Sequence, residues 1–228
     1  MTSVLGIIQP NFLPWRGYFD FIRDCDDFVF LDTVQYTKRD WRNRNVILSQ
    51  GKPQWLTVPV HASNRLSIAD TLIDDTRNWR NKHLKVVEQS YQRCRHGPEM
   101  IDWLSRHYQT SPERLIDLTI PTTKDLARRL GITTRFHLAS DFELPNGREE
   151  RLISLCHQLS ARRYLSGSAA RTYMTPDKWA LANIEVVFKV YPQYPTYPQH
   201  AAEFHPNVSI FDLLANMGEA AADYIWKH

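Results

Sequence analysis

The amino-acid sequence predicts an α/β fold, with a Rossmann-like parallel sheet and a helical insertion in the middle of the chain. Near the N-terminus, the apolar run VLGII is followed by a turn-rich loop, a helical pattern and a second apolar run, DDFVFLD. This order is typical of a βαβ unit, whose two strands are parallel. A helical pattern then occupies the middle of the chain before strands and helices alternate again. We therefore expect a single domain over residues 1–228 with a helical insertion at about 76–131.

The N-terminal elements follow from short apolar runs and turn residues. VLGII, DDFVFLD and PQWLTVPV are rich in β-branched or aromatic residues and are bounded by turn formers, so each predicts a strand. In GYFDFIRDC, residues Tyr18, Phe21 and Cys25 recur at helical spacing, which predicts the crossover helix. VILSQGKPQWLTVPV predicts a β-hairpin with Gly51 and Pro53 at its turn.

The remaining elements are predicted in the same way. Three helical stretches follow one another: NWRNKHLKVVEQSYQRC, PEMIDWLSRHYQ and SPERLIDLTIPTTKDLARRLGI. The last of these has Ser111 as a plausible N-cap and Gly131 as a stop signal. Further strands are predicted in TRFHLAS, ARRYLSG and IEVVFKVY, with REERLISLCHQL as the helix between the first two. A loop rich in proline, tyrosine and histidine then leads to a final helix in SIFDLLANMGEAAADYIWKH.

Composition and charge exclude several classes of protein. The net charge is +3, and the lysines and arginines are dispersed rather than gathered in a run. This argues against a dedicated nucleic-acid binder but not against a protein with an anionic small substrate. The three cysteines are odd in number and far apart, which suits a reducing compartment. No signal-peptide pattern and no apolar run approaching about 20 residues occurs, so we expect a cytoplasmic protein without a membrane span.

The first candidate site is the loop QPNFLPWRG, which begins where the first strand ends. In open α/β sheets, ligands bind at the carboxyl ends of the strands. Gln9 and Asn11 offer directed hydrogen bonds there, and neither of them nor Arg16 is expected to serve packing. Gly17 would let the backbone approach a ligand closely. The alternative is a stiff, aromatic-packed loop with Trp15 in the core.

The second candidate site is LDTVQYTKRDWRNRN, residues 31 to 45, which follows the second strand. Arg44 could clamp a carboxylate or phosphate through its planar fork, and Lys38 could act as a point charge. Asp32 could move a proton. The alternative is a solvated hairpin. Because both clusters follow strands at the same sheet edge, we expect them to face one cleft. The other binding residues predicted in this stretch are Gln35, Tyr36, Trp41, Asn43 and Asn45.

The histidines give further candidates. His83 lies on the apolar face of a predicted helix, where it could be a satisfied core residue or a proton-transfer group. His200 is a second proton-transfer candidate, and Gln199 beside it is expected to help shape a pocket. His200, His205 and Glu203 could together suggest metal ligation. No third ligand at helical spacing accompanies the histidines, so we predict no structural metal and leave any cofactor unidentified.

Five blocks of the sequence together resemble the WbqC-like protein family. They are QPNFLPWRGYFDFI, DDFVFLDTVQYTKRDWRNRN, WLTVPV, YLSGSAARTY and YPQHAAEFHPNVSIFDLLANMG, in this order over nearly the whole chain. Proteins of this family occur in O-antigen and other polysaccharide gene clusters. The resemblance implies a glycine or aminoacyl transferase role.

A more distant resemblance concerns the N-terminal βαβ unit, which is similar to the HxGH region of the nucleotidylyltransferase superfamily. On that pattern, Trp15 and Tyr18 stand where the superfamily has its two histidines. An indole and a phenol cannot replace two imidazoles in stabilising a transferring phosphoryl group. YLSGSAAR is similar to the superfamily's serine-rich phosphate signature, where backbone N–H groups would hold an anion. The residues that this second likeness assigns to phosphate binding are Ser166, Gly167, Ser168 and Arg171.

These observations lead to one function hypothesis and two alternatives. The leading hypothesis is a transferase that moves an aminoacyl (glycyl) or other acyl group onto an amino sugar or related acceptor in polysaccharide biosynthesis. Its substrate would be an anionic small molecule of the nucleotide, nucleotide-sugar or acyl-phosphate type. The first alternative is a non-catalytic nucleotide or nucleotide-sugar binding module, and the second is an enzyme that acts on modified nucleic acid. The catalytic residues predicted for the transferase are Asp32, Lys38, Arg44 and His83.

Overall fold

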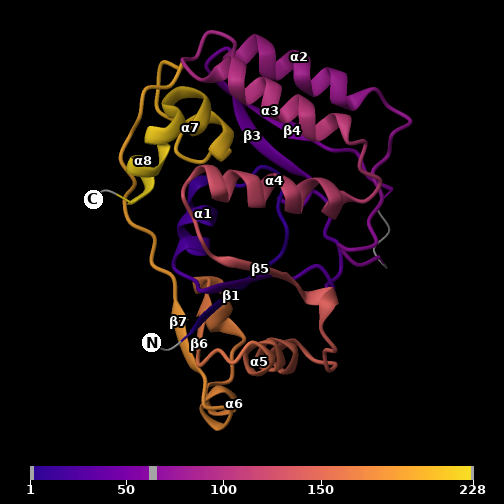
Figure 1. Ribbon diagram of the computed structural model, residues 1–228, viewed down its shortest axis with the longest axis vertical. Helices are drawn as coiled ribbons and strands as arrows, with labels where there is room; N and C mark the ends of the chain where they lie inside the picture. The colour runs from indigo at the N-terminus through magenta and orange to yellow at the C-terminus, as the bar shows by residue number, and fades with distance from the viewer. Residues whose placement is uncertain (1–2, 62–65, 227–228) are drawn as a thin grey trace.

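A five-stranded parallel sheet forms the centre of the molecule, in a computed structural model that describes residues 3–61 and 66–226 (Figure 1). The spatial order of the strands is β5-β2-β1-β6-β7, and every neighbouring pair is parallel. This arrangement confirms the predicted α/β class and is Rossmann-like. The strands are β1 (Val4–Ile8), β2 (Asp27–Phe30), β5 (Arg135–Leu138), β6 (Arg163–Ser166) and β7 (Glu185–Phe188).

The strand order reverses at β1, which pairs with β2 on one side and β6 on the other. Leu5 is opposite Asp27 in the first pair and opposite Tyr164 in the second. The chain runs outward through β2 and β5 and then returns to β6 and β7. The loops that begin at Gln9 and Gly167 therefore leave the same edge of the sheet on either side of this reversal. Such a switch point is where α/β sheets place their ligands.

Helices cover both faces of the sheet (Figure 1). On one face lie α1 (Arg16–Arg23) and α4 (Leu115–Arg129), and on the other α5 (Arg148–Gln158) and α6 (Pro176–Leu181). Because side chains alternate along a strand, β2 contributes to two separate cores. Phe28 and Phe30 pack toward α1 and α4, whereas Val29 packs toward α5 and α6.

A two-stranded hairpin lies beyond α1 and α4, apart from the central sheet. It consists of β3 (Arg44–Ser49) and β4 (Lys52–Thr57), which pair antiparallel, so the predicted hairpin is confirmed. Gly51 is at the turn with φ +73, as expected for a glycine. Pro53, however, lies inside β4 opposite Leu48 rather than in the turn.

The hairpin is packed against the helices of the middle of the chain and of the C-terminus (Figure 1). These are α2 (Trp79–Tyr91) and α7 (Ile210–Met217), and α3 (Gly97–Gln109) packs on both of these helices. Ser111 is not the N-cap of α4, because its φ of +49 places it in a left-handed turn. Arg114 takes that position, and the Asp117 carboxylate accepts hydrogen bonds from the Arg114 N–H at 3.3 Å and from its guanidinium at 2.8 and 2.9 Å.

The C-terminal segment is not one continuous helix as predicted. Gly218 has φ +56, which ends α7, and a short 3-10 turn, η3 (Gly218–Ala222), leads into α8 (Asp223–Trp226). Two further 3-10 turns directly follow strands at the carboxyl edge of the sheet. They are η1 (Ala139–Asp141) and, one residue beyond the end of β6, η2 (Ser168–Thr172).

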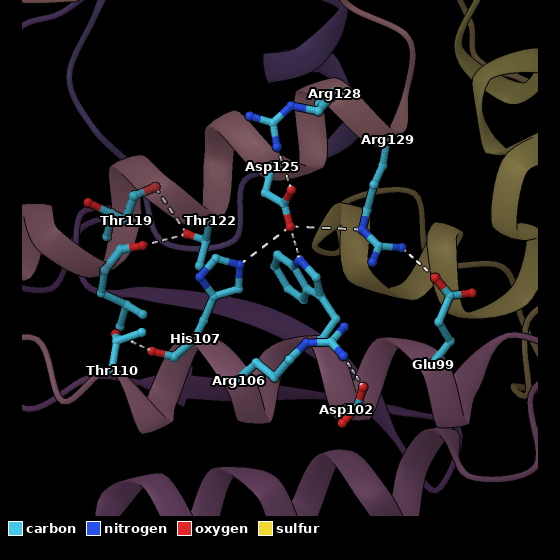
Figure 2. Close-up of polar contacts among 12 residues, drawn as sticks. Glu99, Asp102, Arg106, His107, Thr110, Thr119, Thr122, Asp125, Arg128 and Arg129 are labelled. Atoms are coloured by element: carbon cyan, nitrogen blue, oxygen red, sulfur yellow. Dashed lines mark hydrogen bonds and ion pairs between the residues drawn. The ribbon is translucent and has the colours of Figure 1, made fainter.

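Polar contacts, in addition to apolar packing, join α3 to α4 (Figure 2). The Asp125 carboxylate accepts hydrogen bonds from the Trp103 indole N–H and from Arg128 Nη1, the latter at 3.0 Å. One turn further along α4, Arg129 pairs with Glu99 at 2.6 Å. These groups belong to the helical layer and lie outside both hollows described below.

Candidate functional site

The loop after β1 is held in place by Asn45 of β3. Asn45 Nδ2 donates to the carbonyl oxygens of Phe12 (3.2 Å) and Leu13 (2.8 Å), while its Oδ1 accepts from the Val46 N–H at 2.8 Å. Phe12 and Leu13 are themselves buried. The amide of Asn45 is thus fully used as a clamp between the two predicted clusters.

Arg42 makes a second connection between these clusters. Its guanidinium donates to Asn11 Oδ1, and the Phe12 N–H donates to the Trp41 carbonyl oxygen at 3.0 Å. The Arg42 side chain is only 12% exposed, and its ion pair with Asp40 is long, at 3.5 Å. Burial lowers the pKa of Arg42, and Asp40 partly offsets that effect. Sequence reasoning missed Arg42, since nothing in WRNRN distinguishes it from Arg44.

The two loops enclose a hollow of about 390 Å³, called here the amide hollow. Four of its lining residues were predicted from the sequence, and they come from both clusters, as expected. Asn207, from the segment before α7, was not predicted. Of the six described residues that line it, none is charged. They are Asn11, Pro14, Trp15, Trp41, Asn45 and Asn207.

A second hollow of about 440 Å³, called here the basic hollow, opens between the segment before β3 and the segment before α2. Among the described residues, four cationic side chains line it against one carboxylate, that of Asp74. Arg39 and Arg77 were not predicted. Arg77 reaches the hollow from a distant part of the chain. The described residues that line it are Tyr36, Lys38, Arg39, Asn43, Arg44, Thr57, Pro59, Val60, Asp74 and Arg77.

Two buried polar atoms on residues of the basic hollow have no hydrogen-bond partner within the described part of the chain. They are Asn43 Oδ1 and Arg44 Nε. Asn43 is buried, and only its Nδ2 is used, by a 2.7 Å bond to the Val58 carbonyl oxygen. A buried polar group without a partner costs about 1–3 kcal/mol, so such atoms are expected to meet a ligand or water.

Trp55 of β4 joins the two hollows. The Arg44 guanidinium lies 4.3 Å from the centre of the Trp55 ring, and the Trp41 and Trp55 rings are 5.3 Å apart. Trp41 and Trp55 are 44% and 46% exposed. An exposed aromatic surface therefore runs from the basic hollow to the amide hollow.

Gly17 and Tyr18 do not serve a ligand in the way that was predicted. A Cβ at Gly17 would lie 2.3 Å from the Trp15 indole, so the glycine makes room for that ring. Tyr18 is buried, and its hydroxyl donates to the Gln9 carbonyl oxygen at 3.1 Å. Burial raises the pKa of Tyr18 well above its ordinary value of 10. Its phenol is not free to contact a substrate.

Arg16 also differs from the prediction that it does not serve packing. The side chain is buried, and it donates to the Pro195 carbonyl oxygen at 2.8 Å. Its guanidinium lies 4.8 Å from the centre of the Tyr194 ring. Arg16 thus anchors the C-terminal loop over α1.

Neither predicted proton-transfer residue of the N-terminal half lines a hollow. Asp32 is fully buried, and its carboxylate accepts from the Ser140 N–H (3.0 Å) and hydroxyl (2.7 Å). His83 is bonded through Nδ1 to the Tyr108 hydroxyl (3.0 Å) and through Nε2 to the Thr57 carbonyl oxygen (3.1 Å). Burial lowers the pKa of His83 to about 4. These contacts give both residues a structural role.

The C-terminal loop uses Gln199 for its own organisation. Gln199 Nε2 donates to the Asp212 carboxylate at 2.9 Å, and its Oε1 accepts from the His205 N–H at 2.8 Å. His200 is exposed and lines a separate hollow of about 200 Å³ beside Asp212. Within residues 3–61 and 66–226, no group of three or more His, Cys, Asp or Glu side chains is arranged to hold a metal ion.

The segment after β6 lies at the switch point but lines neither hollow. The Ser166 side chain is buried, with its hydroxyl 3.4 Å from that of Tyr164. A Cβ at Gly167 would meet open space, and Ser168 is exposed. The Arg171 guanidinium lies 4.4 Å from the centre of the Phe188 ring.

Three further features lie outside the hollows. Gln35, which was predicted to bind a ligand, is exposed and pairs through its backbone with Ser67. The three thiols are buried, and burial raises the pKa of Cys94 to about 11, which disfavours a reactive thiolate. In the described ranges, no helix is both long and apolar enough to cross a membrane.

Fold and site together define a Rossmann-like α/β protein with paired basic and aromatic–amide hollows built on the loops beside its first two strands. A family model matches residues 9–224, and the chain belongs to the WbqC-like protein family. The chain is 41% identical to an uncharacterized protein of Mycobacterium tuberculosis over 224 residues, 97% of this chain and 96% of that relative. No solved structure matches the chain, and the likeness to HxGH nucleotidylyltransferases is not confirmed.

Proposed function

We propose that the protein is a transferase that acts on an anionic, activated small molecule. It would move an aminoacyl or other acyl group onto an amino sugar or related acceptor in polysaccharide biosynthesis. The observation that supports this proposal most is the basic hollow, where four cations surround one carboxylate and two buried polar atoms lack a partner. The acyl-transfer chemistry itself comes from the resemblance to the WbqC-like family.

The cations of the basic hollow differ from several arginines elsewhere in the protein that are paired with carboxylates. Arg80 and Arg129 are neutralised by carboxylates within 3 Å. In contrast, Lys38, Arg39 and Arg77 have no carboxylate within 4 Å among the residues that the structure describes. Uncompensated cations gathered around a concave surface raise the local concentration of anions.

This charge arrangement suits a phosphate-activated acyl donor. The acceptor nitrogen would attack the acyl carbonyl carbon, the bond from that carbon to the phosphate oxygen would break, and the nitrogen would release its proton to water. The phosphate then leaves with the bonding electron pair. Lys38 and Arg39 would stabilise the negative charge that grows on this leaving group, which is the kind of electrostatic contribution that dominates many enzymes.

A second candidate function is a binding module without catalysis. The observation that favours it is the burial of Asp32 and His83, whose hydrogen bonds are taken up within the fold. Such a module would recognise the same nucleotide or nucleotide sugar in the basic hollow.

The anion site is tested by binding measurements with inorganic pyrophosphate and a panel of nucleotides. We expect the double variant Lys38→Ala/Arg77→Ala to bind these anions at least about tenfold more weakly, because a hydrogen bond to a charged group contributes roughly 1.5–3 kcal/mol. Calorimetric titration at two salt concentrations gives the affinity and its ionic component. Arg106→Ala is the matched control, because this exposed arginine lies on α3 and is paired with Asp102.

Equal affinity of the double variant and the wild type would contradict the anion site. Catalysis is tested separately, by incubating the protein with acyl phosphates and amino sugars and identifying amide products by mass spectrometry. Anion binding without any product would favour the binding module over the transferase.

A further inference from the structure

The amide hollow has a lining that differs in kind from that of the basic hollow. It presents two indole rings, a proline and three carboxamides, and none of these six described residues carries a charge. An anion would find no counter-charge in it. Indole faces pack on C–H surfaces, and carboxamides both donate to and accept from hydroxyl groups. This chemistry fits a neutral ring that bears hydroxyl groups.

The orientation of the Asn11 amide is set by Arg42. A guanidinium has only donors, so the atom that it contacts on Asn11 must be the amide oxygen. The Asn11 Nδ2 group then carries two donors that have no partner within the described part of the chain. Asn45, in contrast, uses both ends of its amide to hold the loop. Asn11 is therefore the amide of this pair that can donate to a ligand.

Trp41 provides an exposed apolar surface at the same place. Its backbone is fixed by hydrogen bonds to Asp40 (2.7 Å) and Phe12 (3.0 Å), while its ring stays 44% exposed. The volume of the hollow, about 390 Å³, lies within the range of roughly 300–1,000 Å³ that small-molecule sites occupy. Trp55 continues the aromatic surface from Trp41 to Arg44, so one ligand can reach both hollows.

We propose that the amide hollow is the subsite for the pyranose ring of a phosphorylated acceptor, whose phosphate shares the cations of the basic hollow with the phosphate of the acyl donor. This inference rests on the proposed function. Asn11 Nδ2 donates to a ring hydroxyl, and the Trp41 indole packs on the ring. Arg42 is a positioning residue that fixes the Asn11 amide.

The test compares the affinity for pyranose 1-phosphates with the affinity for inorganic phosphate, each measured by calorimetry or ligand-observed NMR. The ratio of the two affinities reports the sugar subsite alone. For at least one of glucose, galactose and N-acetylglucosamine 1-phosphates, we expect the wild-type ratio to be about ten or more, equivalent to about 1.4 kcal/mol. Asn11→Asp keeps an oxygen for Arg42 but removes both donors, so it should lower the ratio toward one. Trp41→Ala should do the same.

Two controls separate this inference from the proposed function. Lys38→Ala/Arg77→Ala should weaken both ligands and leave the ratio unchanged. Asn81→Asp makes the same chemical change at an exposed position of α2 and should have no effect on either ligand. The melting temperature of each variant verifies that it is folded.

A wild-type ratio near one for all three sugar phosphates, with phosphate or pyrophosphate still bound, would overturn the sugar subsite and leave the anion site intact. Failure of every anion to bind would instead reject the proposed function, and this inference with it. A nucleoside monophosphate could instead show a larger affinity ratio over phosphate than the sugar phosphates do, and Trp41→Ala could lower that ratio equally. This result would show that the hollow holds a nucleobase and would also overturn the pyranose subsite.

Discussion

Burial divides the polar side chains that follow β2 into two kinds. Asp32 is fully buried and its carboxylate meets the N–H and hydroxyl of Ser140. Asn43 is nearly as buried, yet its Oδ1 has no partner within the described residues. A satisfied buried group stabilises the fold, whereas an unsatisfied one has a cost that a ligand can remove. This contrast favours a scaffold role for Asp32 and supports the place of Asn43 in the proposed site.

The role of Asp32 is tested by two substitutions. Asp32→Ala leaves both donors of Ser140 without their acceptor, so we expect the free energy of unfolding to fall by about 1–3 kcal/mol. Asp32→Asn still accepts from the Ser140 N–H, and its new amide can donate to the hydroxyl, so the loss should be smaller. Urea denaturation measures both changes.

Ligand binding distinguishes this structural role from proton transfer. If Asp32 belongs to the scaffold, folded Asp32→Asn protein binds anions and turns over any identified substrate like the wild type. A stable Asp32→Asn protein that binds its substrate but has lost all turnover would restore the sequence-based assignment of Asp32 as a catalytic residue.

Much of the amide hollow could be predicted from the sequence, because its residues stand out locally. Asn11 and Trp15 lie in the loop after β1, and Trp41 and Asn45 belong to the polar stretch that follows β2 and runs into β3. Ordinary loops carry neither amides nor indoles in such numbers. The missing members depend on tertiary structure. Asn207 of the amide hollow and Arg77 of the basic hollow come from distant segments, and no local pattern connects them to the two loops.

At the scale of elements, the two glycines assigned to ligand approach have different surroundings. The space beside Gly17, at the start of α1, is filled by the Trp15 indole. The space beside Gly167, between β6 and η2, is open, and the backbone there has φ −73 and ψ 152, which any residue can adopt. Only the glycine after β1 is required by the fold itself.

Alanine at these two positions provides a matched pair of variants. We expect Gly17→Ala to lower the free energy of unfolding by about 1–3 kcal/mol, because the added methyl group overlaps the Trp15 ring and forces it to move. Gly167→Ala should change the free energy of unfolding by no more than about 0.5 kcal/mol. Any small increase would come from the lower conformational entropy of the unfolded chain. Thermal and urea unfolding of the purified variants measures both effects.

The pair also tests the phosphate signature proposed for the segment after β6. If a ligand approaches the backbone at Gly167, the Gly167→Ala protein keeps its stability but binds anions more weakly. Unchanged affinity would remove this segment from the binding site. Unchanged stability of Gly17→Ala would contradict the packing role of Gly17.

Most elements could be predicted, since each strand is a short apolar run and each helix of the insertion has a clear period. The exceptions have local physical causes. The Ser111 backbone is left-handed, so the helix starts four residues later, with Arg114 as its cap. Gly218 interrupts an otherwise helical pattern with a positive φ. The short helix α6 was missed because six residues, Pro176 to Leu181, are too few to show a period.

At the scale of the whole molecule, His83 connects three elements. It belongs to α2, and its two ring nitrogens are bonded to the Thr57 carbonyl oxygen of β4 and the Tyr108 hydroxyl of α3. The hairpin that carries Asn43, Arg44 and Trp55 is therefore tied to the helical layer through a neutral imidazole. Protonation of His83 would place a charge in this buried position.

The pKa of His83 predicts how stability depends on pH. Burial lowers it from 6.5 to about 4 in the folded protein. Between these values the unfolded chain binds more protons than the folded one, so the free energy of unfolding rises with pH. The contribution is fully present above pH 6.5 and is lost as the pH falls toward 4. A shift of this size corresponds to about 3 kcal/mol in total, since one pKa unit is worth about 1.4 kcal/mol.

Comparison with His83→Gln isolates this contribution, because glutamine fills the position without titrating. We expect wild-type protein to lose about 2 kcal/mol more stability than the variant between pH 7 and pH 5, measured by urea denaturation at several pH values. The variant is less stable at pH 7, where it lacks the imidazole contacts, and the two curves converge in acid. Parallel curves would mean that the imidazole is not held neutral between the hairpin and the helices.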